Sequence, residues 1–251
     1  MTTTIAFTGK SGSGKTSVLK ALLELLQKNY PEKTFLLVDS DLSLELGLSF
    51  GYDIRNTIYG IRSGKHHYQT AIPDMSQQEF VDWALEDIVE PISDNVDMIV
   101  TWLLGSKDCR CPITADIRNG FKKLIKRYDF VFFDCEFDLK YLIQLVDYPI
   151  DTTLIIAKAT EEGVRLAHRI EEYSKKYATG QMGVVLNQVK NGLTEEISAL
   201  LNCYNLDILG VIPFDDKLSK EETKSAKNSD IIKEALSEIL FRLNLPTGGK
   251  L

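Results

Sequence analysis

The feature that most constrains the fold is a glycine-rich octapeptide near the start of the chain. Residues 9–16 read Gly-Lys-Ser-Gly-Ser-Gly-Lys-Thr, which matches the spacing Gly-x-x-x-x-Gly-Lys-[Ser/Thr]. An apolar run over Thr3–Thr8 precedes it, and an amphipathic stretch over Ser17–Asn29 follows. Strand, glycine-rich turn and helix in this order are typical of a phosphate-binding loop, or P-loop. The glycines let backbone N–H groups converge on phosphate oxygens, and the helix N-terminus adds a favourable dipole.

The residue types in this loop predict a site for MgATP. Lys15 is expected to neutralise the β- and γ-phosphates, and the Thr16 hydroxyl is expected to ligate Mg²⁺. An ordinary glycine-rich turn is the alternative. The predicted phosphate site consists of Gly9, Lys10, Ser11, Gly12, Ser13, Gly14, Lys15, Thr16 and Ser17.

Apolar runs and amphipathic stretches alternate along the rest of the chain. The predicted strands are Thr3–Thr8, Thr34–Val38, Met98–Trp102, Phe130–Asp134, Thr153–Ala157, Met182–Asn187 and Leu209–Ile212. The predicted helices are Ser17–Asn29, Glu79–Ile92, Ile113–Arg127, Gly163–Tyr177, Thr194–Cys203 and Ile231–Leu243, the last docked on the sheet. Continuous apolar runs are typical of strands covered on both faces. We predict an α/β fold, a single P-loop domain over residues 1–251, with a mainly parallel sheet of about seven strands and helices on both faces.

The segment 51–78 departs from this alternation. It is rich in tyrosine and glycine and has no clear period. We expect a surface insertion here. His66 and His67 within it can be metal ligands, but exposed loop histidines are the simpler interpretation.

Composition excludes several classes of protein. Of 251 residues, 44% are hydrophobic and 26% charged, as in ordinary globular chains. The 29 Lys and Arg residues stand against 36 Asp and Glu residues, a net charge of -7, which disfavours non-specific binding to nucleic acid. The longest apolar run, around Met98–Leu104, is too short to span a membrane, and the N-terminus does not resemble a signal peptide. We expect a cytoplasmic protein with neither nucleic acid nor membrane as a partner.

Acidic residues stand at the ends of two predicted strands. Asp134 ends one of them, and Asp39-Ser40-Asp41 follows another. Ligands of open α/β sheets collect at the carboxyl ends of the strands, so these acids are expected to face the phosphate site. Asp39 and Asp134, the latter as the Walker B residue, are predicted to hold Mg²⁺, and Asp41 to orient or deprotonate the attacking water. A helix cap or a solvated turn is the alternative for Asp41 and Asp134.

The additional lysine, Lys10, gives the loop a more specific resemblance. Gly-Lys-x-Gly-x-Gly-Lys-Thr resembles the deviant Walker A motif of the MinD/ParA/nitrogenase-iron-protein superfamily, although Ser11 and Ser13 replace the usual glycine and small apolar residue. The resemblance implies an ATPase that forms a nucleotide-dependent homodimer, in which Lys10 reaches the partner's phosphates. It also implies that Asp39–Asp41 is switch I. Two segments resemble the adenine-contacting ones, which implies adenine contacts at Asn187, Pro213, Phe214 and Asp215.

A pair of cysteines narrows the resemblance further. Gly105-x-x-x-Cys109-Arg-Cys111-Pro112 resembles the Cys-x-Cys segment of CooC-type ATPases, which assist nickel insertion into carbon monoxide dehydrogenase. Two thiolates from one chain cannot complete a tetrahedral site, whereas a twofold dimer supplies four, enough for Ni²⁺, Zn²⁺ or a [4Fe–4S] cluster. Two unconnected loop thiols are the alternative. The remaining cysteines, Cys135 and Cys203, are expected in the core.

These observations favour an ATP-hydrolysing, dimeric metallochaperone that couples its nucleotide state to Ni/Zn binding at Cys109 and Cys111. Its expected client is a metalloenzyme such as carbon monoxide dehydrogenase. Three alternatives remain. They are an ATP-gated iron–sulfur reductase, a MinD/ParA-like positioning ATPase, and a small-molecule kinase. The acidic charge argues against positioning on membrane or DNA, and a kinase leaves Lys10 and the cysteine pair unexplained.

Overall fold

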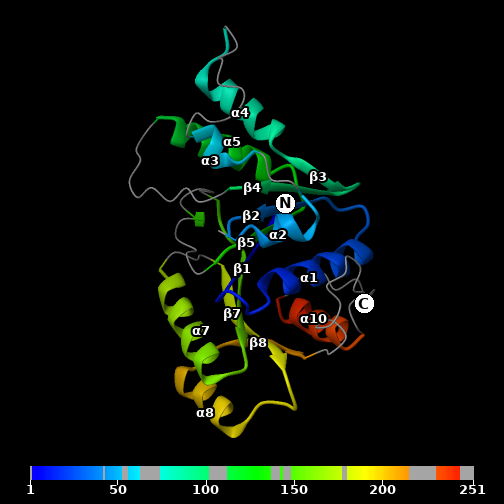
Figure 1. Ribbon diagram of the computed structural model, residues 1–251, viewed down its shortest axis with the longest axis vertical. Helices are drawn as coiled ribbons and strands as arrows, with labels where there is room; N and C mark the ends of the chain where they lie inside the picture. The colour runs from blue at the N-terminus through cyan, green and yellow to red at the C-terminus, as the bar shows by residue number, and fades with distance from the viewer. Residues whose placement is uncertain are drawn as a thin grey trace. The chain divides into compact units, whose positions relative to one another are not determined.

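The helices and strands of the chain are labelled in Figure 1. The computed structural model describes residues 2–41, 43–52, 56–62, 74–101, 112–136, 142–143, 148–176, 180–214 and 230–243. They divide into two units. The first unit comprises Met1–Ile5 and Lys33–Ile150, and the second comprises Ala6–Glu32 and Asp151–Leu251.

The described residues contain eight strands, which confirms an α/β fold with a mainly parallel sheet. The strand order is β3-β4-β2-β5-β1 in the first unit and β1-β6-β7-β8 in the second, because β1 (Thr3–Thr8) is divided between them. β2 pairs in parallel with β4 and β5, and β7 pairs in parallel with β6 and β8. Only the β3–β4 pair among these is antiparallel. The eighth strand, one more than expected, is β3.

Three strands of the first unit bring two carboxylates side by side. β2 (Phe35–Asp39) lies between β4 (Val96–Val100) and β5 (Phe130–Asp134). Every residue of β2 and β5 is buried, as their continuous apolar runs predict. The parallel register pairs Asp39 with Asp134, so both acids stand at the carboxyl ends of their strands.

The predicted helix over Glu79–Ile92 is wrong at its end. α4 spans Gln77–Asp87, and β3 (Glu90–Ser93) then forms the edge strand beside β4. Pro91 explains the difference, because it has no N–H to donate. A helix interior requires this donor, whereas an edge strand tolerates its absence.

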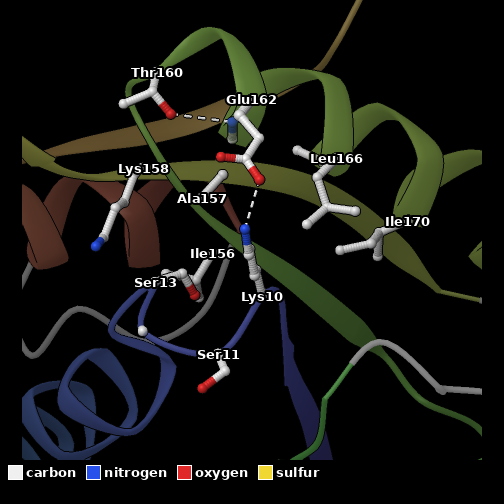
Figure 2. A pocket seen from close by; sticks show the side chains of 13 residues that line it. Lys10, Ser11, Ser13, Ile156, Ala157, Lys158, Thr160, Glu162, Leu166 and Ile170 are labelled. Carbon is white, nitrogen blue, oxygen red and sulfur yellow. Dashed lines mark hydrogen bonds and ion pairs between the residues drawn. The ribbon is translucent and has the colours of Figure 1, made fainter.

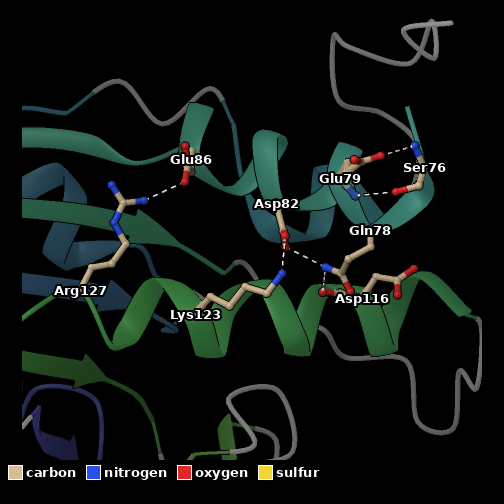
Figure 3. Close-up of polar contacts among 8 residues, drawn as sticks. All are labelled: Ser76, Gln78, Glu79, Asp82, Glu86, Asp116, Lys123 and Arg127. Carbon is tan, nitrogen blue, oxygen red and sulfur yellow. Dashed lines mark hydrogen bonds and ion pairs between the residues drawn. The ribbon is translucent and has the colours of Figure 1, made fainter. Parts of the chain in front are cut away.

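α4 packs closely against α5 (Pro112–Ile125). Lys123 of α5 forms an ion pair with Asp82 of α4, as Figure 3 shows. Exposed pairs of this kind contribute about 0–1 kcal/mol. Apolar contact carries more of the packing: a Cβ added at Gly120 would lie 2.7 Å from Leu85 Cδ1, so the helices approach where the side chain is smallest.

Part of the predicted surface insertion is helical. After α2 (Glu45–Ser49), α3 spans Ile58–Arg62, and Ile58 and Ile61 are 0% and 2% exposed. The segment thus contributes to the core of the first unit. His66 and His67 lie outside the described residues.

In the second unit, helices pack on three parallel strands. The strands are β6 (Thr152–Lys158), β7 (Gln181–Val189) and β8 (Ile208–Pro213). Buried residues of β6, β7, α7 (Glu161–Ser174) and α8 (Glu195–Tyr204) form one apolar cluster. It includes Ile155, Val164, Ala167, Val184, Leu186, Ile197 and Leu201.

The final helix docks on this unit as predicted. α10 (Asp230–Arg242) packs against β8 and against α1 (Lys15–Asn29), and its Leu236, Ile239 and Leu240 are buried. Within the described ranges, no helix is both long and apolar enough to cross a membrane.

The cysteines differ in their surroundings. Cys135, directly after β5, is buried as expected. The expectation is wrong for Cys203, which is exposed. The buried face of α8 is set by Ile197 and Leu201, and a residue two positions further lies on the opposite side of the helix. Cys109 and Cys111 lie outside the described residues.

The contact between β8 and α10 generates a stability prediction. A Cβ at Gly210 would overlap Ile239, which is 1% exposed and has little room to move. We expect Gly210→Ala to lower the free energy of unfolding by about 1–3 kcal/mol, as overpacking commonly does. Urea unfolding measures this. Gly60→Ala in α3 is the control, because its Cβ meets nothing closer than 3.6 Å. Equal stability of the two variants would contradict the packing described.

Candidate nucleotide-binding site

The loop between β1 and α1 has the backbone conformation that its glycines permit. Gly9, Gly12 and Gly14 have φ angles of 147°, 74° and 92°, which residues with a Cβ rarely adopt. The Ser13 N–H donates to the Lys10 carbonyl over 3.0 Å and closes the turn. α1 begins directly after Gly14, so the N–H groups of its first turn border the loop. This is the geometry that anion binding at a helix N-terminus requires.

Two strands of the second unit hold the loop in place. A Cβ at Gly9 would overlap the Ile156 carbonyl oxygen of β6, so only glycine allows this close approach. On β7, the buried Asn187 donates from Nδ2 to the Ser13 carbonyl over 2.9 Å. A Cβ at Gly14 would overlap the same amide. Asn187, predicted as an adenine contact, therefore supports the phosphate loop in this structure.

The two lysines of the loop differ in exposure. Lys15 is 5% exposed, whereas the Lys10 side chain is 55% exposed. Lys10 Nζ donates to Glu162 Oε1 on α7 over 2.6 Å (Figure 2). Lys15 is thus held at the loop, whereas Lys10 reaches outward to Glu162.

A cavity of about 230 Å³ lies beside the loop in the second unit (Figure 2). Lys10, Ser11, Gly12 and Ser13 line it from the loop, and β6 and α7 line it from the other side. Apolar residues of those two elements, Ile156, Ala157, Leu166, Ala167 and Ile170, contribute to the lining. The cavity therefore combines an apolar wall with polar groups of the loop.

The predicted adenine segments meet at the ends of β7 and β8. The Phe214 N–H donates to the Val189 carbonyl over 2.9 Å, and Pro213 pairs with Val189 in the sheet. Lys190 Nζ stands 4.0 Å from the centroid of the Phe214 ring, a cation–π distance. The structure thus brings Asn187, Pro213 and Phe214 to the same edge of the sheet. Asp215 lies outside the described residues.

In the first unit, the carboxylates at the ends of β2 and β5 are fully buried. Asp39 and Asp134 are both 0% exposed and are register partners. Asp39 accepts hydrogen bonds from the Gly47 N–H at 3.0 Å and from the Asp41 N–H at 3.2 Å. Burial raises the pKa of Asp39 to about 7; the N–H groups lower it in part, and nearby Asp134 raises it further. Two buried acids of this kind suit a bound cation, which would favour their ionised forms.

Asp41 has a local structural role. It is 6% exposed, and its Oδ1 accepts from the Ser43 N–H at 3.0 Å and from the Ser43 hydroxyl at 2.9 Å. This resembles an Asx-turn, although the side chain is buried and the alternative weighed for this residue was a solvated turn. Its predicted role in activating water stays a prediction.

A separate group of possible metal ligands lies on α7. Ligand atoms of His168, Glu171 and Glu172 all lie within 4.8 Å of one another. Lys175 already pairs with both carboxylates, at 3.1 and 2.9 Å. The ammonium group supplies the positive charge there, so we assign no ion to this group.

Sequence reasoning did not identify Glu162 as part of the site. Its partner Lys10 is 152 positions away, and no local pattern links the two. The only signal is a helix start, in which Thr160 caps α7 and acidic residues follow.

The raised pKa of Asp39 predicts how stability depends on pH. Between its ordinary pKa near 4 and about 7, the folded protein holds a proton that the unfolded chain has lost. The resulting stability is complete below about pH 4 and is lost as the pH rises to about 7. We expect the free energy of unfolding of the wild type, relative to Asp39→Asn, to fall across this range. Urea unfolding without nucleotide or metal measures it, and parallel pH profiles would contradict the assignment.

Comparison with known proteins places this geometry in a family. The family model described as the CobQ/CobB/MinD/ParA nucleotide binding domain matches residues 4–227. An uncharacterized ATP-binding protein of Methanocaldococcus jannaschii is 26% identical over 233 residues, which cover 87% of this chain and 88% of that protein.

Two solved structures show the same fold. A plasmid partition protein of Borrelia burgdorferi bound to AMPPNP has a TM-score of 0.67 at 18% identity, covering 97% of this chain and 99% of its own. The septum site-determining protein MinD of Pyrococcus horikoshii, complexed with Mg-ADP, has a TM-score of 0.61 at 19% identity and full coverage of both chains (100%). The matching family model supports the predicted superfamily, whereas none of these comparisons supports the closer resemblance to CooC-type ATPases. The chain belongs to the CobQ/CobB/MinD/ParA family of nucleotide-binding domains.

Proposed function

We propose that the protein binds and hydrolyses MgATP, and that its nucleotide state controls the association of two copies. The observation that carries this proposal is the different placement of the two lysines. Lys15 is buried at the start of α1, where it serves the phosphates bound by its own loop. Lys10 points outward from the same loop, where a second copy's phosphates can meet it.

Magnesium is proposed to bind between the nucleotide and oxygen ligands of the chain. Thr16, Asp39 and Asp134 are the proposed protein ligands, since Mg²⁺ prefers hard oxygen donors. Its charge would offset the mutual repulsion of the two buried carboxylates and allow Asp39 to ionise at neutral pH. The Mg-ADP in the Pyrococcus horikoshii protein is consistent with this assignment.

The proposed reaction is hydrolysis of the terminal phosphate. Water attacks the γ-phosphorus, the bond to the β-γ bridging oxygen breaks, and ADP and phosphate leave. Asp41 is proposed to orient this water and accept its proton, while its Oδ1 accepts the two hydrogen bonds from Ser43. Lys10 and Lys15 stabilise the negative charge that develops on the phosphate oxygens.

The process that the nucleotide-dependent dimer serves is a separate question. Nickel or zinc binding at Cys109 and Cys111, and a carbon monoxide dehydrogenase client, rest on the sequence alone. The relatives bear the names of ATP-binding, plasmid partition and septum-site proteins. A MinD/ParA-like positioning function therefore fits the comparisons better than metal insertion, while the acidic charge still disfavours DNA as the surface.

Lys15→Ala tests the phosphate site. We expect ATP affinity to fall at least about tenfold, because charge-assisted hydrogen bonds contribute about 1.5–3 kcal/mol each. Calorimetric titration with MgATP measures the affinity. Lys28→Ala removes a positive charge from the last turn of the same helix and is the matched control. Equal affinities of the two variants would show that the phosphates bind elsewhere.

Lys10→Ala tests action in trans. We expect this variant to bind ATP like the wild type but to hydrolyse it at least about a hundredfold more slowly, as when a lysine or arginine supplied by a partner is lost. Phosphate release measures the rate. The Lys15→Ala copy retains Lys10, so mixing the two variants should raise hydrolysis above the rate of either variant alone. No recovery in the mixture, or weakened ATP binding by Lys10→Ala alone, would contradict the trans role.

A further inference from the structure

In the Lys10–Glu162 ion pair, Lys10 contacts an acid of its own chain. The proposed function requires the same lysine to contact the phosphates of a second copy. Nζ and Oε1 lie 2.6 Å apart, and both residues line the cavity beside the phosphate loop (Figure 2). Among the described residues that line this cavity, Glu162 is the only acid. Lys10 therefore has an anionic partner within its own chain.

The position of Glu162 is set by the start of α7. The Thr160 hydroxyl accepts from the Gly163 N–H over 3.1 Å, and the Thr160 N–H donates to the Lys158 carbonyl over 2.8 Å. A Cβ at Gly163 would overlap that carbonyl oxygen, so the helix start is pressed against the end of β6. Glu162 is thus presented to the loop from a fixed backbone, which lowers the entropic cost of pairing.

Two effects keep the Glu162 carboxylate ionised. The hydrogen bond and charge of Lys10 lower its pKa. Its place in the first turn of α7 also puts it at the positive end of the helix dipole. The neighbouring acid, Glu161, instead faces Arg165 at 3.6 Å. Only one of the two acids in this turn therefore acts on Lys10.

We propose that Glu162 is a positioning residue that holds Lys10 in its own chain and releases it when the phosphates of a second copy compete for it. This inference rests on the proposed function, since it supplies the regulation of the same lysine. The pair makes a single chain a poorer partner, because only molecules with Lys10 released can reach across.

The exposure of the pair limits its strength. The side chains are 55% and 77% exposed, and exposed ion pairs are weak. A triphosphate with Mg²⁺ carries more negative charge than one carboxylate, so it displaces Glu162 from Lys10. The apparent affinity of association is lowered by the fraction of chains in which Lys10 is free. The pair therefore weakens the affinity of association about two- to fivefold and does not prevent association.

The test compares Glu162→Gln with Glu161→Gln, two neighbouring substitutions that remove the same charge. The measured quantity is the dissociation constant of the dimer formed with MgAMPPNP, from sedimentation at 50 mM and 500 mM salt. We expect Glu162→Gln to tighten the dimer about two- to fivefold at low salt, and Glu161→Gln to match the wild type. The difference should shrink at high salt, because the pair is screened. In a Lys10→Ala background, Glu162→Gln should have no effect.

The outcomes separate this inference from the function on which it rests. If Lys10→Ala weakens association but Glu162→Gln behaves like Glu161→Gln, the positioning role is overturned and the trans role of Lys10 stands. An effect of Glu162→Gln that persists in the Lys10→Ala background also overturns it, because the acid would then act through another group. If Lys10→Ala associates like the wild type, the proposed function fails, and the positioning role with it.

Discussion

The close approach of the Gly9 backbone to the Ile156 carbonyl is the constraint on which the candidate site depends. It leaves no room for a Cβ and ties the first turn of the phosphate loop to β6. Asn187 ties the other end of the loop to β7 through the Ser13 carbonyl. With both ends held by the sheet, the loop has fewer conformations to adopt. Contacts that restrict the loop in this way reduce the ordering cost of binding a ligand.

The buried acids of the first unit, in contrast, lower the stability of the folded chain. Asp39 and Asp134 are register partners with no exposure to solvent, and the pKa of Asp39 rises to about 7. Burying two carboxylates destabilises a protein unless a cation or a proton compensates them. The phosphate loop and the two buried acids are the two groups of residues that the proposed function uses. The proposed function assigns the nucleotide to the first and the ion to the second.

Much of the fold could be predicted because the signals were local. β1 and β5 were expected at their observed residues, since each is a continuous apolar run with a clear end. β3 could not be predicted in the same way. Its four residues alternate between intermediate and exposed positions and directly follow a helical pattern, so no periodic signal separates them from α4.

The site was predictable to the extent that its chemistry lies in short motifs. The glycines, Lys15 and the strand-end acids each carry a recognisable local pattern. The pairing of Lys10 with Glu162 does not, because it depends on how α7 is packed against β6. The hydrogen bond from Asn187 to the loop is likewise a long-range contact, and the resemblance had implied only an adenine contact for this residue.

In the proposed function, nucleotide state controls the association of two copies of this chain. Sedimentation of the wild-type protein with Mg²⁺ and either AMPPNP or ADP tests it most directly. We expect the mass of a dimer with AMPPNP and the 28.3 kDa of a single chain with ADP. The same mass with both nucleotides would contradict it.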